Sequence, residues 1–155
     1  MQPHLWATKL TANDAAAKEQ LGIIRLEYDS AGNLAKVYRY VKNTSGGALA
    51  DGNIAVWDLT ADDAYSVTTT ATADVTYPAG VCIGALTSAY FGWMQIGGKH
   101  SSVTMADAVV AGGAFGTGAA AGQGGATAVA GSVMGFAFDA IAAAGTGEVF
   151  LKGLI

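Results

Sequence analysis

Two stretches near the start of the chain show the hydrophobic pattern of β-strands. Residues 23–28 read Ile-Ile-Arg-Leu-Glu-Tyr, and residues 34–41 are rich in β-branched and aromatic side chains. Between them, residues 29–33 contain a glycine and have the length of a hairpin loop. The pattern therefore predicts a β-hairpin.

Short apolar segments separated by glycine-containing turns occupy the rest of the chain. We expect strands near residues 54–58, 65–70, 74–78, 81–87, 90–96, 109–110, 115–117, 133–138 and 148–152. Short strands at such spacing, with glycine turns between them, favour an all-β barrel or sandwich. We therefore expect residues 22–155 to form one compact, mainly β body.

Residues 1–21 have a different pattern and are expected to form an extended N-terminal arm. Residues 11–14, Thr-Ala-Asn-Asp, fit a capping box ahead of an alanine-rich run. They predict one short helix of about two turns that ends near Gly22, too short to be stable alone in water. Three residues near the terminus add apolar bulk to the arm: His4, Leu5 and Trp6.

A weak internal repeat links the two halves of the body. Residues 50–54 resemble 110–114, residues 81–85 resemble 132–136, and residues 92–96 resemble 147–151. The offsets of 60, 51 and 55 residues are unequal, so the chain is not a solenoid. Two related β units joined in one body fit this pattern, and chance similarity among Gly/Ala-rich segments is the alternative.

The composition is that of a folded chain with unusually little charge. Of 155 residues, 52% are hydrophobic, 13% are charged and 22 are glycine. Globular domains average about 25% charged residues, and a disordered chain would be more polar still. Because so few charges are available to cover a monomer's surface, we expect other protein to cover part of it.

The charge is also unevenly distributed. The net charge of −4 argues against nucleic acid as a direct partner, since phosphate binding requires a basic surface. Residues 1–42 contain six basic and four acidic residues, whereas residues 43–155 contain two basic and eight acidic ones. This asymmetry is either chance or a sign that the N-terminal third docks on an acidic neighbour.

The sequence shows no sign of secretion or membrane insertion. Its start lacks the basic and apolar regions of a signal peptide. The longest uncharged run, residues 108–138, is long enough to span a bilayer but consists mostly of Ala, Gly, Ser and Thr. Because glycine weakens helices, we expect strands and loops there, no membrane partner, and a protein made in the cytoplasm.

Residues that usually carry catalysis are few and scattered. His100 lies beside Ser101, but neighbouring residues rarely align for proton transfer. Cys82 lies in an apolar strand, so we expect a buried thiol with a raised pKa. The glycine-rich residues 92–100 lack the Lys-Ser/Thr pair of a phosphate loop. We therefore expect no enzymatic activity, no cofactor and no metal site.

The three tryptophans differ in the roles that the sequence suggests for them. Trp57 and Trp93 suit core packing, with stacking on a sugar or a partner as the alternative. Trp6 lies in no strongly patterned element, which suits an intermolecular anchor.

Two segments of the body resemble a recurrent passage of the head decoration, or capsid cement, proteins of tailed bacteriophages. Residues 80–85 read Gly-Val-Cys-Ile-Gly-Ala, and residues 90–98 read Tyr-Phe-Gly-Trp-Met-Gln-Ile-Gly-Gly. They are similar to a V-x-x-G strand followed by G-W-V-Q-x-x-G in that family. The resemblance continues in order through residues 38–43, 48–52, 108–113, 131–137 and 147–151. It covers most of residues 22–155, whereas residues 1–21 match no pattern of the family.

The resemblance implies a barrel or tulip-like β body without catalysis, located in the virion on the capsid exterior. Such a protein binds the expanded head and bridges major capsid subunits, often as a homotrimer in contact with neighbouring copies. The alternatives are another virion component, in a tail or fibre, and a small carbohydrate-binding β module. The residues expected to contact the capsid or a neighbouring copy lie in the arm and the first hairpin: His4, Leu5, Trp6, Lys9, Arg25 and Arg39.

Overall fold

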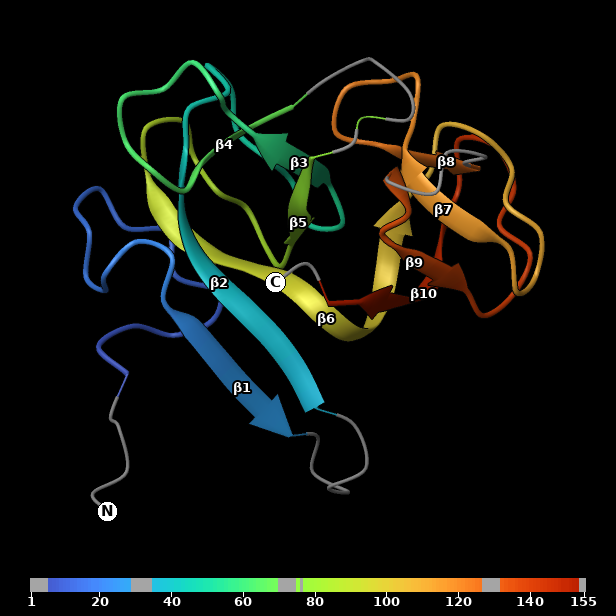
Figure 1. Ribbon diagram of the computed structural model, residues 1–155, viewed down its shortest axis with the longest axis horizontal. Coiled ribbons are helices and arrows are strands. Elements are labelled where there is room, and N and C mark those ends of the chain that lie inside the picture. The colour runs from blue at the N-terminus through green and yellow to red at the C-terminus, as the bar shows by residue number, and fades with distance from the viewer. Residues whose placement is uncertain (1–5, 29–34, 70–74, 76, 127–131, 154–155) are drawn as a thin grey trace.

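A ten-stranded sheet that curls on itself forms the described part of the chain in the computed structural model (Figure 1). The structure describes residues 6–28, 35–69, 75, 77–126 and 132–153. Nearly all regular structure in these residues is β, which confirms the predicted all-β class. The strands are β1 (Ile24–Tyr28), β2 (Ala35–Asn43), β3 (Ile54–Trp57), β4 (Ser66–Thr68), β5 (Pro78–Cys82), β6 (Phe91–Thr104), β7 (Ala114–Thr117), β8 (Gly124–Ala126), β9 (Gly135–Ala137) and β10 (Thr146–Lys152).

The first half of the sheet closes into a ring. Its strands follow the order β2-β4-β3-β5-β6, and a further pairing between β2 and β6 joins the two ends. The β2–β4 pair is parallel, and the other pairs are antiparallel. The ring encloses a core of small and medium apolar side chains: Val41, Leu49, Ala55, Val67, Ala79, Cys82, Leu86 and Met94. The strand β1 lies outside this ring, paired with β2.

The long strand β6 connects this ring to the second half of the molecule (Figure 1). Its first part pairs with β2 and β5, and from Gly97 onward it pairs with β10. The sheet continues through β9, β7 and β8, and Gly124 of β8 returns to a parallel bridge with Met105 just after β6. This second half has its own core, which includes Val103, Phe115 and Leu151.

The two halves repeat the same local structure, which confirms the predicted internal repeat. A bridge between Leu49 and Leu86 precedes β3 and β6, and a bridge between Val109 and Ile141 precedes β7 and β10 in the same way. The offsets of 60 and 55 residues match two of the three predicted ones. The chain is therefore built from two related β units that share β6.

The remaining predicted alignment, of residues 81–85 with 132–136, is wrong by four residues. The Cys82 N–H donates to the Asn53 carbonyl oxygen at 2.8 Å. In the second unit, the Ala137 N–H donates to the Gly113 carbonyl oxygen at 3.0 Å. Cys82 thus corresponds to Ala137, an offset of 55, because these hydrogen bonds fix the register.

The predicted short helix before Gly22 does not form. Residues 15–21 make turns and bends, because a helix of two turns gains too few hydrogen bonds to outweigh the cost of nucleation. The segment instead bonds to the sheet: Asp14 forms an antiparallel bridge with Phe91, and the Gly22 N–H donates to the Tyr40 carbonyl oxygen at 2.8 Å. The division into an arm over residues 1–21 and a body over 22–155 stays a prediction, but residues 6–21 lie against the body.

Several strand boundaries differ from those predicted. Residues 74 and 76 of the strand predicted at 74–78 lie outside the described residues. Among the described residues of 75–87, one strand forms, β5, over Pro78–Cys82. The strand predicted at 109–110 is reduced to a single bridge at Val109. The strand β6 runs past residue 96 to Thr104, because the Gly97-Gly98 pair continues the strand rather than ending it.

Candidate interaction surfaces

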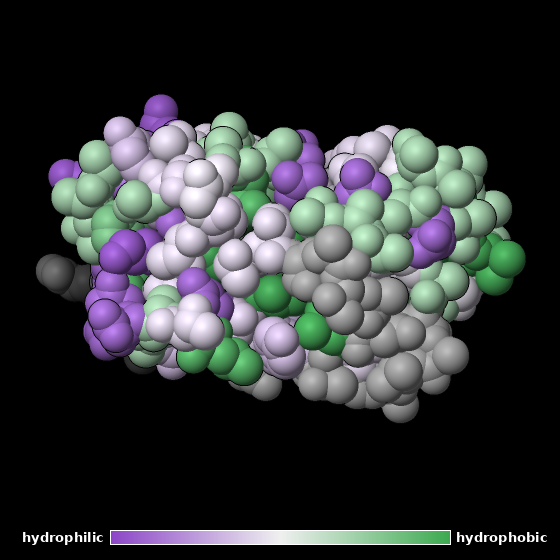
Figure 2. Space-filling view, turned by 90° about the horizontal axis from the view of Figure 1, so that it is seen from above, coloured by the Kyte–Doolittle hydropathy of each residue, from purple (hydrophilic) through white to green (hydrophobic). Residues whose placement is uncertain are grey.

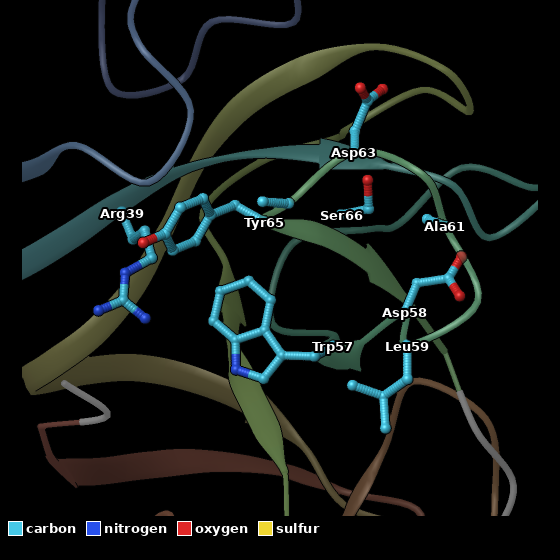
Figure 3. Close-up of a pocket in the computed structure, with 9 residues that line it drawn as sticks. Arg39, Trp57, Asp58, Leu59, Ala61, Asp63, Tyr65 and Ser66 are labelled. Carbon is cyan, nitrogen blue, oxygen red and sulfur yellow. The ribbon is translucent and has the colours of Figure 1, made fainter.

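A groove lies between β2, the end of β3 and residues 58–65. Its volume is about 510 Å³. Arg39 of β2 and Trp57 of β3 enter it from the sheet, and Tyr65 covers it from the loop (Figure 3). The Arg39 guanidinium lies 5.5 Å from the centre of the Trp57 ring and 5.7 Å from that of Tyr65. We call this groove the Arg39 pocket.

The chain fixes the two aromatic rings of the Arg39 pocket at some conformational cost. The rings of Trp57 and Tyr65 meet edge to face, with centroids 5.8 Å apart. Tyr65 has a φ of 63°, a left-handed conformation that is uncommon for a non-glycine residue and recurs at functional sites. Its ring lies directly on Gly22, where a Cβ atom would come within 2.3 Å of the Tyr65 ring. The loop that contains Tyr65 and the N-terminal segment therefore both fix the position of the Tyr65 ring.

Both acidic side chains at the Arg39 pocket are already bonded. The Asp58 carboxylate accepts hydrogen bonds from the Thr44 hydroxyl at 2.7 Å and from the backbone and hydroxyl of Thr60, and these bonds lower the pKa of Asp58. Asp63 forms an ion pair with Lys42 at 2.6 Å. In Figure 3 both carboxylates point away from the Arg39 guanidinium.

Arg39 itself has no hydrogen-bonding partner among the described residues. Its Nε atom is buried and makes no hydrogen bond. Its neighbours are the faces of Trp57 and Tyr65, which attract a cation but do not accept its N–H groups. The pocket therefore contains a positive group with unused donors between two aromatic rings.

A second cluster lies where the N-terminal segment meets the sheet. Trp6 packs edge to face against Trp93, with ring centroids 5.3 Å apart. The Arg25 guanidinium lies over both rings, at 5.4 Å and 5.7 Å, and donates to the Thr8 carbonyl oxygen and to Glu27. We call these residues the Trp6 cluster.

The predicted contact residues thus fall in different places. Arg25 and Trp6 lie together in the Trp6 cluster, and Arg39 lies in the Arg39 pocket. Lys9 is exposed, near the Trp6 cluster in sequence. His4 and Leu5 lie outside the described residues. None of these positions tests whether the residues touch a partner, so the contact set stays a prediction.

The outer face of the second unit carries an aromatic patch. Phe136 of β9 and Phe150 of β10 lie directly opposite each other across the two strands. Together with Phe138 they are 47%, 38% and 45% exposed. The Lys99 ammonium lies 5.4 Å from the Phe138 ring and pairs with Glu148 at 2.8 Å. We call these three phenylalanines the Phe patch.

Of the candidate catalytic residues of the sequence, His100 and Cys82 are buried and Ser101 is exposed. His100 is 5% exposed, its Nδ1 accepts the Ser102 N–H at 3.2 Å, and burial lowers its pKa. Burial raises the pKa of the Cys82 thiol to about 12, as the apolar strand predicted. In the described ranges, no group of three or more His, Cys, Asp or Glu side chains is arranged to hold a metal ion.

The two ends of the molecule differ in polarity on one face. Figure 2 shows polar residues gathered over the end that carries β2 and β4, and mostly pale, weakly apolar residues over the β7–β10 end. Within residues 6–126 and 132–153, as far as they are described, no helix is long and apolar enough to cross a membrane.

Comparison with known proteins finds the fold but no close relative. No family model matches the sequence, and no curated protein matches it. A solved structure of "head fiber gp8.5 N base in bacteriophage phi29" superposes on the chain with a TM-score of 0.57 at 14% identity. The match covers 77% of this chain and 98% of that one. At this identity, the likeness shows a shared fold.

The Arg39 pocket is not predictable from the sequence as a unit. The sequence indicates a core or stacking role for Trp57 and a contact role for Arg39, but no pattern joins them to Tyr65. Their neighbourhood depends on the parallel β2–β4 pairing, which brings Lys42 opposite Ser66. The available signal was the run Trp-Asp-Leu at residues 57–59, which places an apolar residue just beyond the strand predicted at residues 54–58.

Proposed function

We propose that this protein is a structural component of a phage virion that binds the outside of the expanded head and bridges major capsid subunits. The observation that carries the proposal is the fold shared with a bacteriophage head fibre base over 77% of the chain. It agrees with the motifs of head decoration proteins in residues 80–98. We also propose that the protein is made in the host cytoplasm and needs neither enzymatic activity nor nucleic acid for this role.

The surface chemistry supports binding to protein. The body beyond Met105 contains four charged residues in its last 50 positions, Asp107, Asp139, Glu148 and Lys152. A weakly charged surface is inexpensive to desolvate when it packs against other protein. A protein that binds only the assembled lattice stabilises that lattice by mass action.

We propose that the Phe patch mediates contact between copies, giving a homotrimer. Two exposed phenylalanines on adjacent strands and Phe138, just after β9, form an apolar surface of the kind that marks protein–protein contacts. The N-terminal region, with its net charge of +2 over residues 1–42, then faces the capsid.

A second candidate is the base of a head fibre. The description of the structural neighbour as a head fibre base favours it. The two roles differ in what the protein carries, because a fibre base anchors a fibre that projects from the head and a decoration protein needs none. Electron microscopy of the particle, which shows whether a fibre projects from each copy, separates them.

Cosedimentation with capsids tests the proposal. We expect the purified protein to pellet with expanded capsids of its phage and to stay in the supernatant with unexpanded ones. Failure to pellet with any capsid form would contradict capsid binding.

A short truncation tests the contribution of the arm. Removing residues 1–20 would also take Trp6 and Leu10 away from their packing on Tyr40 and Trp93. Removing residues 1–5 leaves that packing in place, and we expect it to weaken capsid binding. Unchanged binding by this truncated protein would remove His4 and Leu5 from the contact set.

A further inference from the structure

We propose that the Arg39 pocket binds the carboxylate of an acidic segment of a protein partner. Identification of that partner as a capsid subunit rests on the function proposed above. The chemistry of the pocket rests on the structure alone.

The first argument is that Arg39 lacks an acidic partner of its own. Of the two carboxylates at the pocket, Asp58 is bonded to Thr44 and Thr60, and Asp63 is paired with Lys42. The buried Nε atom of Arg39 has no acceptor, and the terminal Nη groups, which are not buried, make no hydrogen bond to a described residue. An incoming carboxylate can accept hydrogen bonds from these accessible Nη groups, and the planar guanidinium suits it better than any other side chain would.

The second argument is the shape of the pocket around this charge. Trp57 and Tyr65 meet the guanidinium with their rings, so its position is fixed before a ligand arrives. Leu59 and Tyr65 are 73% and 42% exposed and provide an apolar rim. A volume of about 510 Å³ accommodates a short peptide segment rather than a single ion. The strained φ of Tyr65 is explained if the ring must stand at this rim.

The third argument separates a peptide from a sugar. A sugar-binding site presents an open aromatic face and free acceptors for hydroxyl groups. Here the Arg39 guanidinium lies over the Trp57 ring, and both carboxylates already accept bonds from the protein. An acidic side chain flanked by apolar residues needs only the guanidinium and the rim, so the pocket favours a peptide.

The test titrates the intact protein with defined probes and follows the NMR signals of the Trp57 indole and the Tyr65 amide. The probes are the peptide acetyl-Ala-Leu-Glu-Leu-Ala-amide, its glutamine analogue, and glucuronic acid. We expect the glutamate peptide to shift both signals saturably. Because hydrogen bonds to charged groups are strong, we expect its affinity to fall about 10- to 100-fold for the glutamine analogue and for Arg39→Gln.

Two further variants keep the test decisive. Lys18→Gln removes an exposed positive charge from residues 1–42, the region that also contains Arg39, but Lys18 does not line the pocket. We expect this variant to bind the glutamate peptide like the unaltered protein. Arg39→Lys keeps the charge and the aliphatic stem, so it preserves folding if Arg39→Gln does not. We expect it also to weaken binding, because an ammonium lacks the planar fork.

Three results would overturn the inference. These are equal loss of affinity in Lys18→Gln and Arg39→Gln, equal binding of the two peptides, and signal shifts with glucuronic acid but not with the glutamate peptide. Cosedimentation distinguishes this failure from failure of the proposed function. If Arg39→Gln pellets with capsids as well as the unaltered protein does, the capsid role stands and the pocket is not its contact. If the peptide binds as expected but no capsid does, the pocket stands and its partner is another protein.

Discussion

The packing of Trp6 on Trp93 predicts that one substitution will loosen the whole N-terminal segment. In Trp6→Ala, the edge-to-face contact and the Arg25 contact to the Trp6 ring are both lost. Such an aromatic pair contributes about 0.5–1.5 kcal/mol and an exposed cation–π contact about 0.5–1 kcal/mol. Losing both contacts should lower the free energy needed to open the N-terminal segment by about 1–2.5 kcal/mol.

Native-state hydrogen exchange measures this opening directly. The Asp14 N–H donates to the Phe91 carbonyl oxygen at 3.0 Å, so its exchange requires the segment to leave the sheet. We expect Trp6→Ala to accelerate this exchange by about 5- to 70-fold, and to leave the Leu49 amide in the first ring unchanged. Val110→Ala, which shortens a side chain that is 72% exposed, is the matched control.

One result would refute the docked segment. If the Asp14 amide exchanges at the rate of an unstructured peptide in the unaltered protein, residues 6–21 form the free arm that the sequence predicted. Unchanged protection in Trp6→Ala would instead show that other contacts hold the segment.

Three further predictions concern buried positions. A Cβ atom at Gly92 would lie 2.7 Å from the Ala12 carbonyl oxygen, so Gly92→Ala should lower the free energy of unfolding in urea by about 1–3 kcal/mol. At Gly47 the space is open, so Gly47→Ala should be neutral or slightly stabilising in the same assay. Equal effects of the two substitutions would contradict the close approach at Gly92. His100 has a folded-state pKa below its unfolded value, so its neutral form is the one that fits the fold, and stability should fall as the pH drops below about 6.5 toward the folded pKa. His100→Asn should reduce the pH dependence of the free energy of unfolding, measured with urea, between about pH 7.5 and pH 5.5. An unchanged pH dependence in this variant would exclude His100 as its cause. The Cys82 thiol, with its pKa raised to about 12, should resist a chromogenic disulfide reagent at about pH 8 until the protein is unfolded, and rapid labelling of the native protein would contradict its burial.

The fold class was predictable because its signals are local. Apolar residues in short runs between glycine turns identified most strands, and the turns at Gly52 and Gly112 revealed the repeat at its correct offset. The alignment of Gly84 with Gly135 was wrong because Gly/Ala-rich segments match in several registers, and only hydrogen bonds such as that from Cys82 to Asn53 select one.

Other features were not predictable because they depend on tertiary contacts. The alanine-rich residues 15–17 have helical propensity, but bonds to Tyr40 and Phe91 hold the flanking chain against the sheet. The Arg39 pocket joins residues far apart in sequence through a parallel strand pair. Such contacts have no periodic signal, so the candidate site emerged only from the folded chain.

The copy number of the protein in purified virions tests the central claim most directly. Quantitative mass spectrometry against the major capsid protein gives the ratio of the two in intact particles. The proposed role predicts hundreds of copies at a fixed ratio to the major capsid protein, removable from the capsid exterior without loss of the head shell. Absence from the particle, or a handful of copies per virion, would contradict it.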